Sequence, residues 1–241
     1  MVGFEVWADA ADLANVNYAI GADRVTPTFG FRGNTPFRGL ADNLGTVTTD
    51  TLWSASGNRL GILNMLVNQR GAQYQLQVQM NVDSAALNYR FMTTGSGKFD
   101  IWSSAQFGFC DMVLNIPTAA QYPPIANYVM PDQNKHIVDS WACSDNVLTV
   151  ANYYNEVSYI DYTGAVATVP GTEGALSTNS SKGPTRDDRV KPDVAATGDI
   201  TMSAGPLDGL AALIAQQPYK VAPGGMHFRN GGTSMASPVV T

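Results

Sequence analysis

Residues 231 to 238 read Gly-Gly-Thr-Ser-Met-Ala-Ser-Pro, close to the carboxyl end of a 241-residue chain. The small residues allow the backbone to pack closely around one hydroxyl group, that of Ser234. Met235 and Ala236 favour a helix with Ser234 at its amino end. The unpaired N–H groups and the positive end of the helix dipole at such a terminus stabilise negative charge. The stretch therefore predicts a nucleophilic serine whose reaction generates an anion.

Two further stretches precede this one in the chain. Residues 180 to 198 read SSKGPTRDDRVKPDVAATG, and residues 146 to 152 read NVLTVAN. Together the three stretches resemble the subtilisin-like serine proteases (subtilases, peptidase family S8), which carry similar motifs in the same order. Lys182 stands where the family usually has arginine, Asn179 where phenylalanine is common, and Thr197 where proline is common. The resemblance covers about residues 137 to 241 and implies a partial catalytic domain of the α/β type with a parallel sheet.

The resemblance also assigns roles within the nucleophile motif. It implies that Ser234 is the catalytic residue of a serine endopeptidase that forms an acyl-enzyme, and that its backbone N–H contributes to the oxyanion hole. A protein or peptide is then the expected substrate. The flanking residues of the motif are Gly232, Thr233, Met235, Ala236 and Pro238.

The other catalytic groups of a subtilase have no matching motif in this chain. Subtilases order their triad as Asp, His and Ser, but the family's Asp-Ser/Thr-Gly, His-Gly-Thr and Gly-Asn motifs are absent. His227 lies only seven residues before Ser234, so we expect a strand or loop residue and not the base, and we expect His136 at the surface. We therefore expect a fragment of a longer protease that begins at an expression start and is inactive alone. A fragment of a pseudoprotease is the alternative.

The first half of the chain has the pattern of a β protein. Residues 74 to 82 alternate apolar and polar side chains without a break, which is typical of a half-buried strand. Shorter alternating runs occur at residues 2 to 7, 87 to 91 and 99 to 102, with glycine-rich turns between them. We predict a β-sandwich or jelly-roll domain over residues 1–130, followed by the partial catalytic domain over 137–241. Some bacterial subtilases, including clostridial spore-germination proteases, carry a similar insert between their His and Ser segments.

Composition excludes several classes of partner and location. The net charge is −6, and the cluster Lys182, Arg186, Arg189 and Lys191 is interrupted by aspartates, so we expect a solvated loop and no nucleic-acid binding. The longest strongly apolar helical segment is far shorter than the ~20 residues of a membrane span. The abundance of Asn, Gln, Ser and Thr is typical of a secreted or periplasmic bacterial protein, although no signal peptide opens this sequence. The oligomeric state stays open.

Metal, disulfide and glycan sites have weaker support. Asp42, Asp50, Asp83 and Asp100 lack the dense spacing of a calcium loop, so we expect no cofactor and find no motif for structural calcium. Cys110 and Cys143 form either one disulfide or two buried thiols. The tryptophans at positions 7, 53 and 102 pack in the core or line a sugar-binding face. A protein- or glycan-binding β module is therefore a third reading of the chain.

Overall fold

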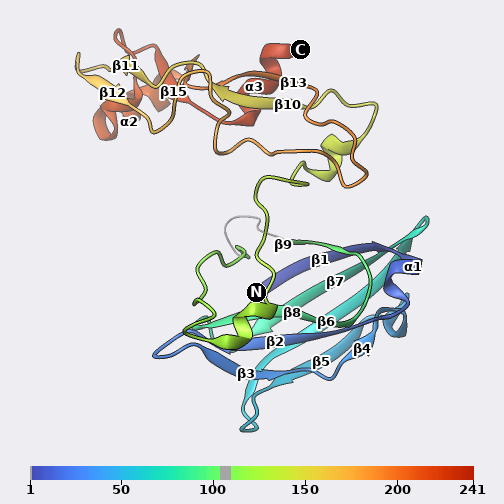
Figure 1. Ribbon diagram of the computed structural model, residues 1–241. Helices are drawn as coiled ribbons and strands as arrows, with labels where there is room; N and C mark the ends of the chain where they lie inside the picture. Colours follow the sequence, from blue (N-terminus) through green and yellow to red (C-terminus); the bar gives the residue numbers. More distant parts are fainter. Residues whose placement is uncertain (1, 104–109) are drawn as a thin grey trace. The chain divides into compact units, whose positions relative to one another are not determined.

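The computed structural model describes residues 2 to 103 and 110 to 241. The chain divides into two compact units, Met1–Pro131 and Asp132–Thr241, and strands predominate over helices (Figure 1). In the part of the chain that is described, no helix has the length and hydropathy of a membrane span.

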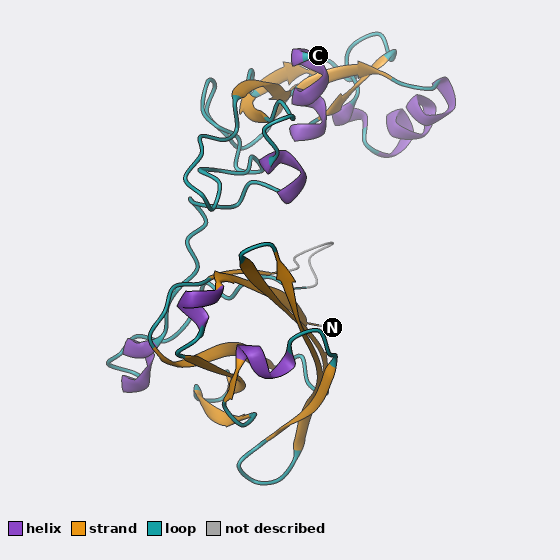
Figure 2. Cartoon of the chain, turned by 90° about the vertical axis from the view of Figure 1, so that its right-hand side faces the viewer, coloured by secondary structure: helices purple, strands orange, loops and turns teal. Residues whose placement is uncertain are grey.

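Two antiparallel sheets make up the first unit. One has the strand order β5-β6-β7-β1-β9, and in the other β2 pairs with β3, β4 and β8. Their strands curve around a common interior (Figure 2). The bounds of the first sheet are β1 Val2–Asp9, β5 Thr48–Trp53, β6 Arg59–Arg70, β7 Gln73–Val82 and β9 Asp100–Ser103. Those of the second sheet are β2 Val16–Arg24, β3 Gly30–Asn34, β4 Arg38–Gly39 and β8 Leu87–Gly95. Short helices are α1 Ala10–Leu13, η1 Leu40–Asn43 and η3 Pro123–Asn127.

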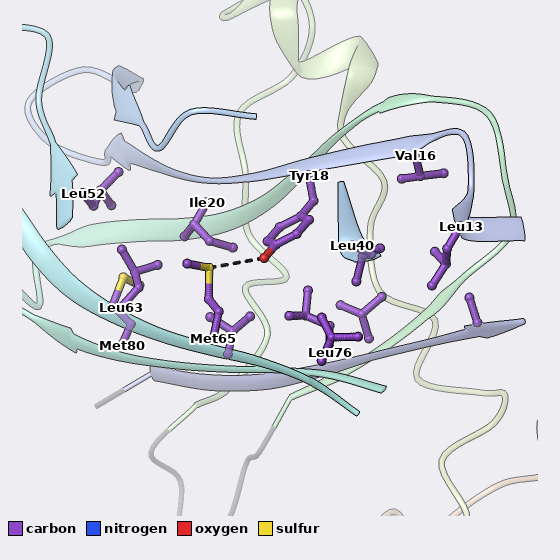
Figure 3. Packing of buried hydrophobic residues seen from close by; sticks show 14 of the residues in the cluster. Leu13, Val16, Tyr18, Ile20, Leu40, Leu52, Leu63, Met65, Leu76 and Met80 are labelled. Atoms are coloured by element: carbon purple, nitrogen blue, oxygen red, sulfur yellow. Dashed lines mark hydrogen bonds between the residues drawn. The ribbon is translucent and has the colours of Figure 1, made fainter. Parts of the chain in front are cut away.

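The alternation along residues 74 to 82 is confirmed by burial. Leu76, Val78 and Met80 are at most 1% exposed, whereas Gln79 between them is exposed. These side chains meet the second sheet, from which Tyr18 points toward Met65 and donates its hydroxyl to the thioether 3.5 Å away (Figure 3). The first unit therefore has one apolar core between its two sheets. Its buried members include Val6, Ala8, Val16, Tyr18, Ile20, Leu40, Leu52, Leu63, Met65, Val67, Leu76, Val78 and Met80.

The proline-rich segment at the end of the first unit is anchored to the second sheet. After η3, Tyr128 donates its hydroxyl to Asp23 at 2.9 Å. Arg90 pairs with the same carboxylate at 3.2 Å and stacks over the Tyr128 ring at 4.6 Å. Burial raises the pKa of Asp23, and the Arg90 charge opposes that rise. Through Tyr128, the proline-rich segment is therefore held against the Asp23–Arg90 ion pair of the second sheet.

The second unit has a parallel pair of strands at its centre. β10 Val150–Tyr154 pairs in parallel with β13 Val194–Asp199, and α3 Thr233–Val240 packs against both strands. The strand predicted at residues 146 to 152 therefore starts later than its sequence pattern suggests. β14 Thr201–Ala204 pairs with β15 His227–Asn230, and β11 Ser158–Ile160 pairs with β12 Val166–Thr168. The remaining helices are α2 Leu207–Gln216, η4 Ser140–Cys143 and η5 Pro218–Lys220.

Candidate active site

The nucleophile motif forms the turn from β15 into α3. Ser234 is the second residue of α3 and its side chain is exposed, with Met235 half-buried and Ala236 fully buried behind it. The hydroxyl is therefore accessible while the next turn of the helix anchors it. Pro238 lies inside this helix.

Gly232 fixes the start of the helix through both of its backbone groups. Its φ of 125° lies in the region that favours glycine. Its N–H donates to the Gly198 carbonyl at 2.9 Å, and its own carbonyl accepts from the N–H of Met235 at 2.9 Å. The turn is thereby bonded backwards to β13 and forwards into α3.

Two neighbouring glycines allow the backbone to approach closely at this point. A Cβ atom on Gly198 would lie 2.5 Å from the Gly232 carbonyl oxygen, and one on Gly231 would lie 2.1 Å from Asp199 Oδ1. No side chain fits within such distances. Glycine at these positions is therefore a packing requirement of the nucleophile turn.

A polar network centred on Asp199, with Asn152 and Ser177 fully buried and Asn179 exposed, lies beside the turn. The Asp199 carboxylate oxygen Oδ2 accepts from Ser177 Oγ at 2.7 Å, from Asn152 Nδ2 at 2.8 Å and from Asn179 Nδ2 at 3.0 Å. Asn152 is fully buried, and its backbone N–H donates to Ser180 Oγ at 3.0 Å. The network joins β10, the segment before β13 and the end of β13, so it holds the three together where α3 packs.

A pocket of about 340 Å³ adjoins the turn within the second unit. Its wall includes the Asp199 carboxylate and the cationic side chains of Lys220 and Arg229, beside Gly231. Hydrogen bonds with the Thr178 and Ser177 side chains lower the pKa of Tyr154, which also lines it. The pocket is therefore polar and carries charges of both signs. Its other lining residues are Val169, Pro170, Asn179, Ile200 and Asn230.

Comparison with known proteins identifies the family to which this arrangement belongs. The model of the subtilase family matches residues 42–241. The chain belongs to the subtilase family. The match begins within the first unit, so it extends beyond the motif-bearing part at residues 137 to 241. No curated protein and no solved structure matches the chain.

The two histidines of this subtilase lie at described positions in the second unit. His227 is exposed at the start of β15, where it pairs with Ala204. His136 Nδ1 lies 3.0 Å from the Thr185 carbonyl oxygen. Within the described residues the Ser234 hydroxyl makes no hydrogen bond.

The cationic loop before β13 is more structured than its composition suggests. Lys191 is only 7% exposed, and its Nζ donates to the Val147 carbonyl and to Asp193, both at 2.7 Å. This hydrogen bond from Lys191 is the main cause that lowers the pKa of Asp193. The expectation of a solvated lysine is therefore wrong at position 191, because its methylene chain and ammonium group are both used in packing. Arg189 is held by Asp187 and Asp145.

The two cysteines are free thiols, each partly exposed, and lie in different units. Burial raises the pKa of the Cys143 thiol, and the nearby Arg189 charge opposes that rise. Among the residues that the structure describes, no group of His, Cys, Asp and Glu could hold a metal ion.

Proposed function

We propose that Ser234 is the nucleophile of a secreted bacterial serine endopeptidase, of which this chain supplies the nucleophile-bearing part. The proposal rests on one observation: an exposed hydroxyl at the amino end of α3, on a turn bonded to β13 through Gly232. The Ser234 oxygen attacks the scissile carbonyl, its proton passes to a base, and the amine leaves as an acyl-enzyme forms. The helix amino terminus and the Ser234 N–H stabilise the oxyanion.

The same proposal assigns a different type of domain to each unit. Residues 137–241 form a partial α/β catalytic domain, and residues 1–130 form a jelly-roll-like insert. The two-sheet sandwich around one core supports the second assignment, and the parallel pair β10–β13 supports the first. Low charge content and abundant Asn, Gln, Ser and Thr support secretion.

The isolated chain is proposed to be inactive, because a serine without a base has an unperturbed hydroxyl. Incubation of the 241-residue chain with a fluorophosphonate probe tests this directly. We expect no labelling at the rate of an active protease, and rapid labelling of Ser234 would mean that a base lies within these residues.

The role of Ser234 itself is tested in the gene that contains this sequence together with its upstream region. Ser234→Ala should lower kcat for peptide hydrolysis by a factor on the order of 10⁶, a loss already known for the subtilisin serine. The matched control is Ser237→Ala, which removes an exposed hydroxyl one helical turn further along α3 and should retain activity. Equal activity of wild type and Ser234→Ala would refute the assignment. Absence of activity from the whole wild-type protein would favour a pseudoprotease.

A further inference from the structure

The pocket beside the nucleophile turn has two cationic side chains in its wall, Arg229 on β15 and Lys220 in η5. Both residues are half-buried. Within the part of the chain that the structure describes, neither forms an ion pair with a carboxylate. A half-buried cation has lost part of its hydration, and an anionic group of a ligand can replace what is lost. We call this site the cationic pocket.

Tyr159 on β11 connects the two elements that carry these cations. Its hydroxyl donates to the carbonyl of Tyr219, the residue next to Lys220, and it also hydrogen-bonds the Arg229 side chain. The Lys220 ammonium lies 6.0 Å from the centroid of the Tyr219 ring. These contacts hold η5 and β15 beside β11, so the two cations need little reordering when a ligand binds.

The third charge of the wall, the Asp199 carboxylate, is engaged elsewhere. Its Oδ2 accepts hydrogen bonds from the side chains of Ser177, Asn152 and Asn179. Its Oδ1 lies against the backbone of Gly231, where an added Cβ would be 2.1 Å away. Since the wall has two cations and one carboxylate, it carries a net positive charge. An anionic ligand group is therefore favoured over a cationic one.

The size and the remaining lining of the cationic pocket indicate which anion fits. Its volume of about 340 Å³ is at the small end of the range for ligand sites. Val169, Pro170 and Ile200 provide apolar surface that can cover methylene groups. The planar guanidinium of Arg229 suits a carboxylate, which can accept two parallel hydrogen bonds from it. A short aliphatic chain that ends in a carboxylate matches these features, and Asp and Glu side chains have this form.

The position of the pocket relates it to the nucleophile. Gly231 lines the pocket, and Ser234 follows three residues later in the chain. Consecutive Cα atoms are about 3.8 Å apart, so the Cα atoms of these two residues are separated by at most about 11 Å. An extended peptide covers that distance in about three to four residues. A side chain in the pocket therefore belongs to a residue within about four positions of a peptide bond held at Ser234.

We propose that the cationic pocket binds an Asp or Glu side chain of the peptide substrate, and that Arg229 and Lys220 determine this specificity. The inference rests on the proposed function, since it assumes that the bound peptide is cleaved at Ser234. The substrate carboxylate accepts hydrogen bonds from the two cations, while the peptide backbone passes Gly231 toward the nucleophile.

Cleavage of paired peptides by the whole protein, encoded together with its upstream region, tests the specificity. The two peptides of a pair differ only by Glu or Gln at one position, and the position is scanned over four residues on each side of the cleaved bond. At one position kcat/KM should be about tenfold higher for Glu, the effect of one charge-assisted hydrogen bond. Arg229→Gln should bring this ratio close to one, and Arg229→Lys should keep part of it. The matched control is Lys135→Gln, which removes an exposed cation that does not line the pocket and should keep the ratio.

A binding measurement separates failure of this proposal from failure of the catalytic one. N-acetylglutamate methylamide is titrated into the ¹⁵N-labelled 241-residue chain, and the signals of the Gly231 amide and the Arg229 Nε–H are followed by NMR. We expect saturable shifts, and the uncharged N-acetylglutamine methylamide should need about tenfold higher concentration for the same shifts. If circular dichroism shows that Arg229→Gln is unfolded, Lys220→Gln replaces it in both experiments and should lower the preference for Glu.

Equal kcat/KM for Glu and Gln at every scanned position would overturn the proposal, even in an enzyme that depends on Ser234. Shifts that do not distinguish the two probes, or a preference for Glu that survives in Arg229→Gln, would also overturn it. If the whole protein cleaves no peptide but the chain still binds the glutamate probe selectively, the nucleophile assignment fails and the carboxylate selectivity of the pocket stands.

Discussion

Substitution of Gly198 by alanine probes the contact on which the nucleophile turn depends. The added Cβ would lie 2.4 Å from Asn152 Oδ1 and 2.5 Å from the Gly232 carbonyl oxygen. Each atom must retreat by about 1 Å to approach the ~3.5 Å at which such atoms attract. Overpacking of this kind costs about 1–3 kcal/mol. Moving Gly232 away from Gly198 also weakens the 2.9 Å hydrogen bond from the Gly232 N–H to the Gly198 carbonyl. The loss of this bond adds about 1 kcal/mol to the cost.

Native-state hydrogen exchange of the Gly232 amide is the direct assay, since it reports local opening even when global stability changes little. A loss of about 2–4 kcal/mol corresponds to a decrease in protection of at least about thirtyfold. The control is Gly209→Ala in α2, where the added Cβ comes no closer than 3.3 Å, to the Pro206 ring. Equal protection of the Gly232 amide in both variants would refute the claim that this close approach positions the turn.

Three further predictions concern stability, each measured by urea unfolding of the whole chain. Leu63→Ala should destabilise the first unit by about 2–5 kcal/mol, because Leu63 is fully buried between the sheets; a loss under 1 kcal/mol would contradict the packing described. Tyr128→Phe should cost about 1–3 kcal/mol, since it removes a hydrogen bond from the buried Asp23 carboxylate, and an unchanged midpoint would show that the segment is not anchored there. Hydrogen bonds from Arg189 and Thr185 lower the pKa of Asp187 to about 2 from an ordinary 3.8. The contribution of Asp187 to the free energy of unfolding is therefore complete above pH 3.8 and lost as the pH falls toward 2. Asp187→Asn should remove this part of the pH dependence of stability. A stability–pH profile identical to that of the wild type would count against the ion pair.

The strands that the sequence predicts well are those with one face in water. Residues 74 to 82 alternate visibly because Leu76 and Val78 face the core while Gln77 and Gln79 face outward. β2 gives no such pattern, although it is the central strand of its sheet. Its residues 18 to 23 are all buried, since the core covers one side and Arg90 and Tyr128 cover Asp23 on the other. A strand buried on both faces shows no alternation of apolar and polar residues. The partners of Asp23, which are Arg90 and Tyr128, lie far from it in the sequence.

Within the candidate site, the sequence predicts the backbone turn and the helix start. It does not predict which side chains hydrogen-bond to one another. The serine and its helix follow from local composition, because small residues and a helix start are local properties. The network around Asp199 does not, because Ser177, Asn179 and Asn152 are ordinary loop and strand residues until the fold brings them together. Asn152 and Ser180 lie within the motifs at residues 146 to 152 and 180 to 198, but the motifs do not predict the hydrogen bonds that these two residues make.

The co-occurrence of two separated motifs has a physical explanation in this structure. The stretch that ends at Gly198 and the stretch that begins at Gly231 meet, since the Gly232 N–H donates to the Gly198 carbonyl. Gly198 must lack a side chain because the Gly232 carbonyl lies beside it. Gly231 must lack a side chain because the Asp199 carboxylate lies beside it. Neither motif can build the turn alone. The motif that ends at Gly198 provides the accepting carbonyl and the space beside it, and the motif that begins at Gly231 provides the donating N–H and the helix. A sequence that holds only one of them would place its serine hydroxyl on an unsupported loop.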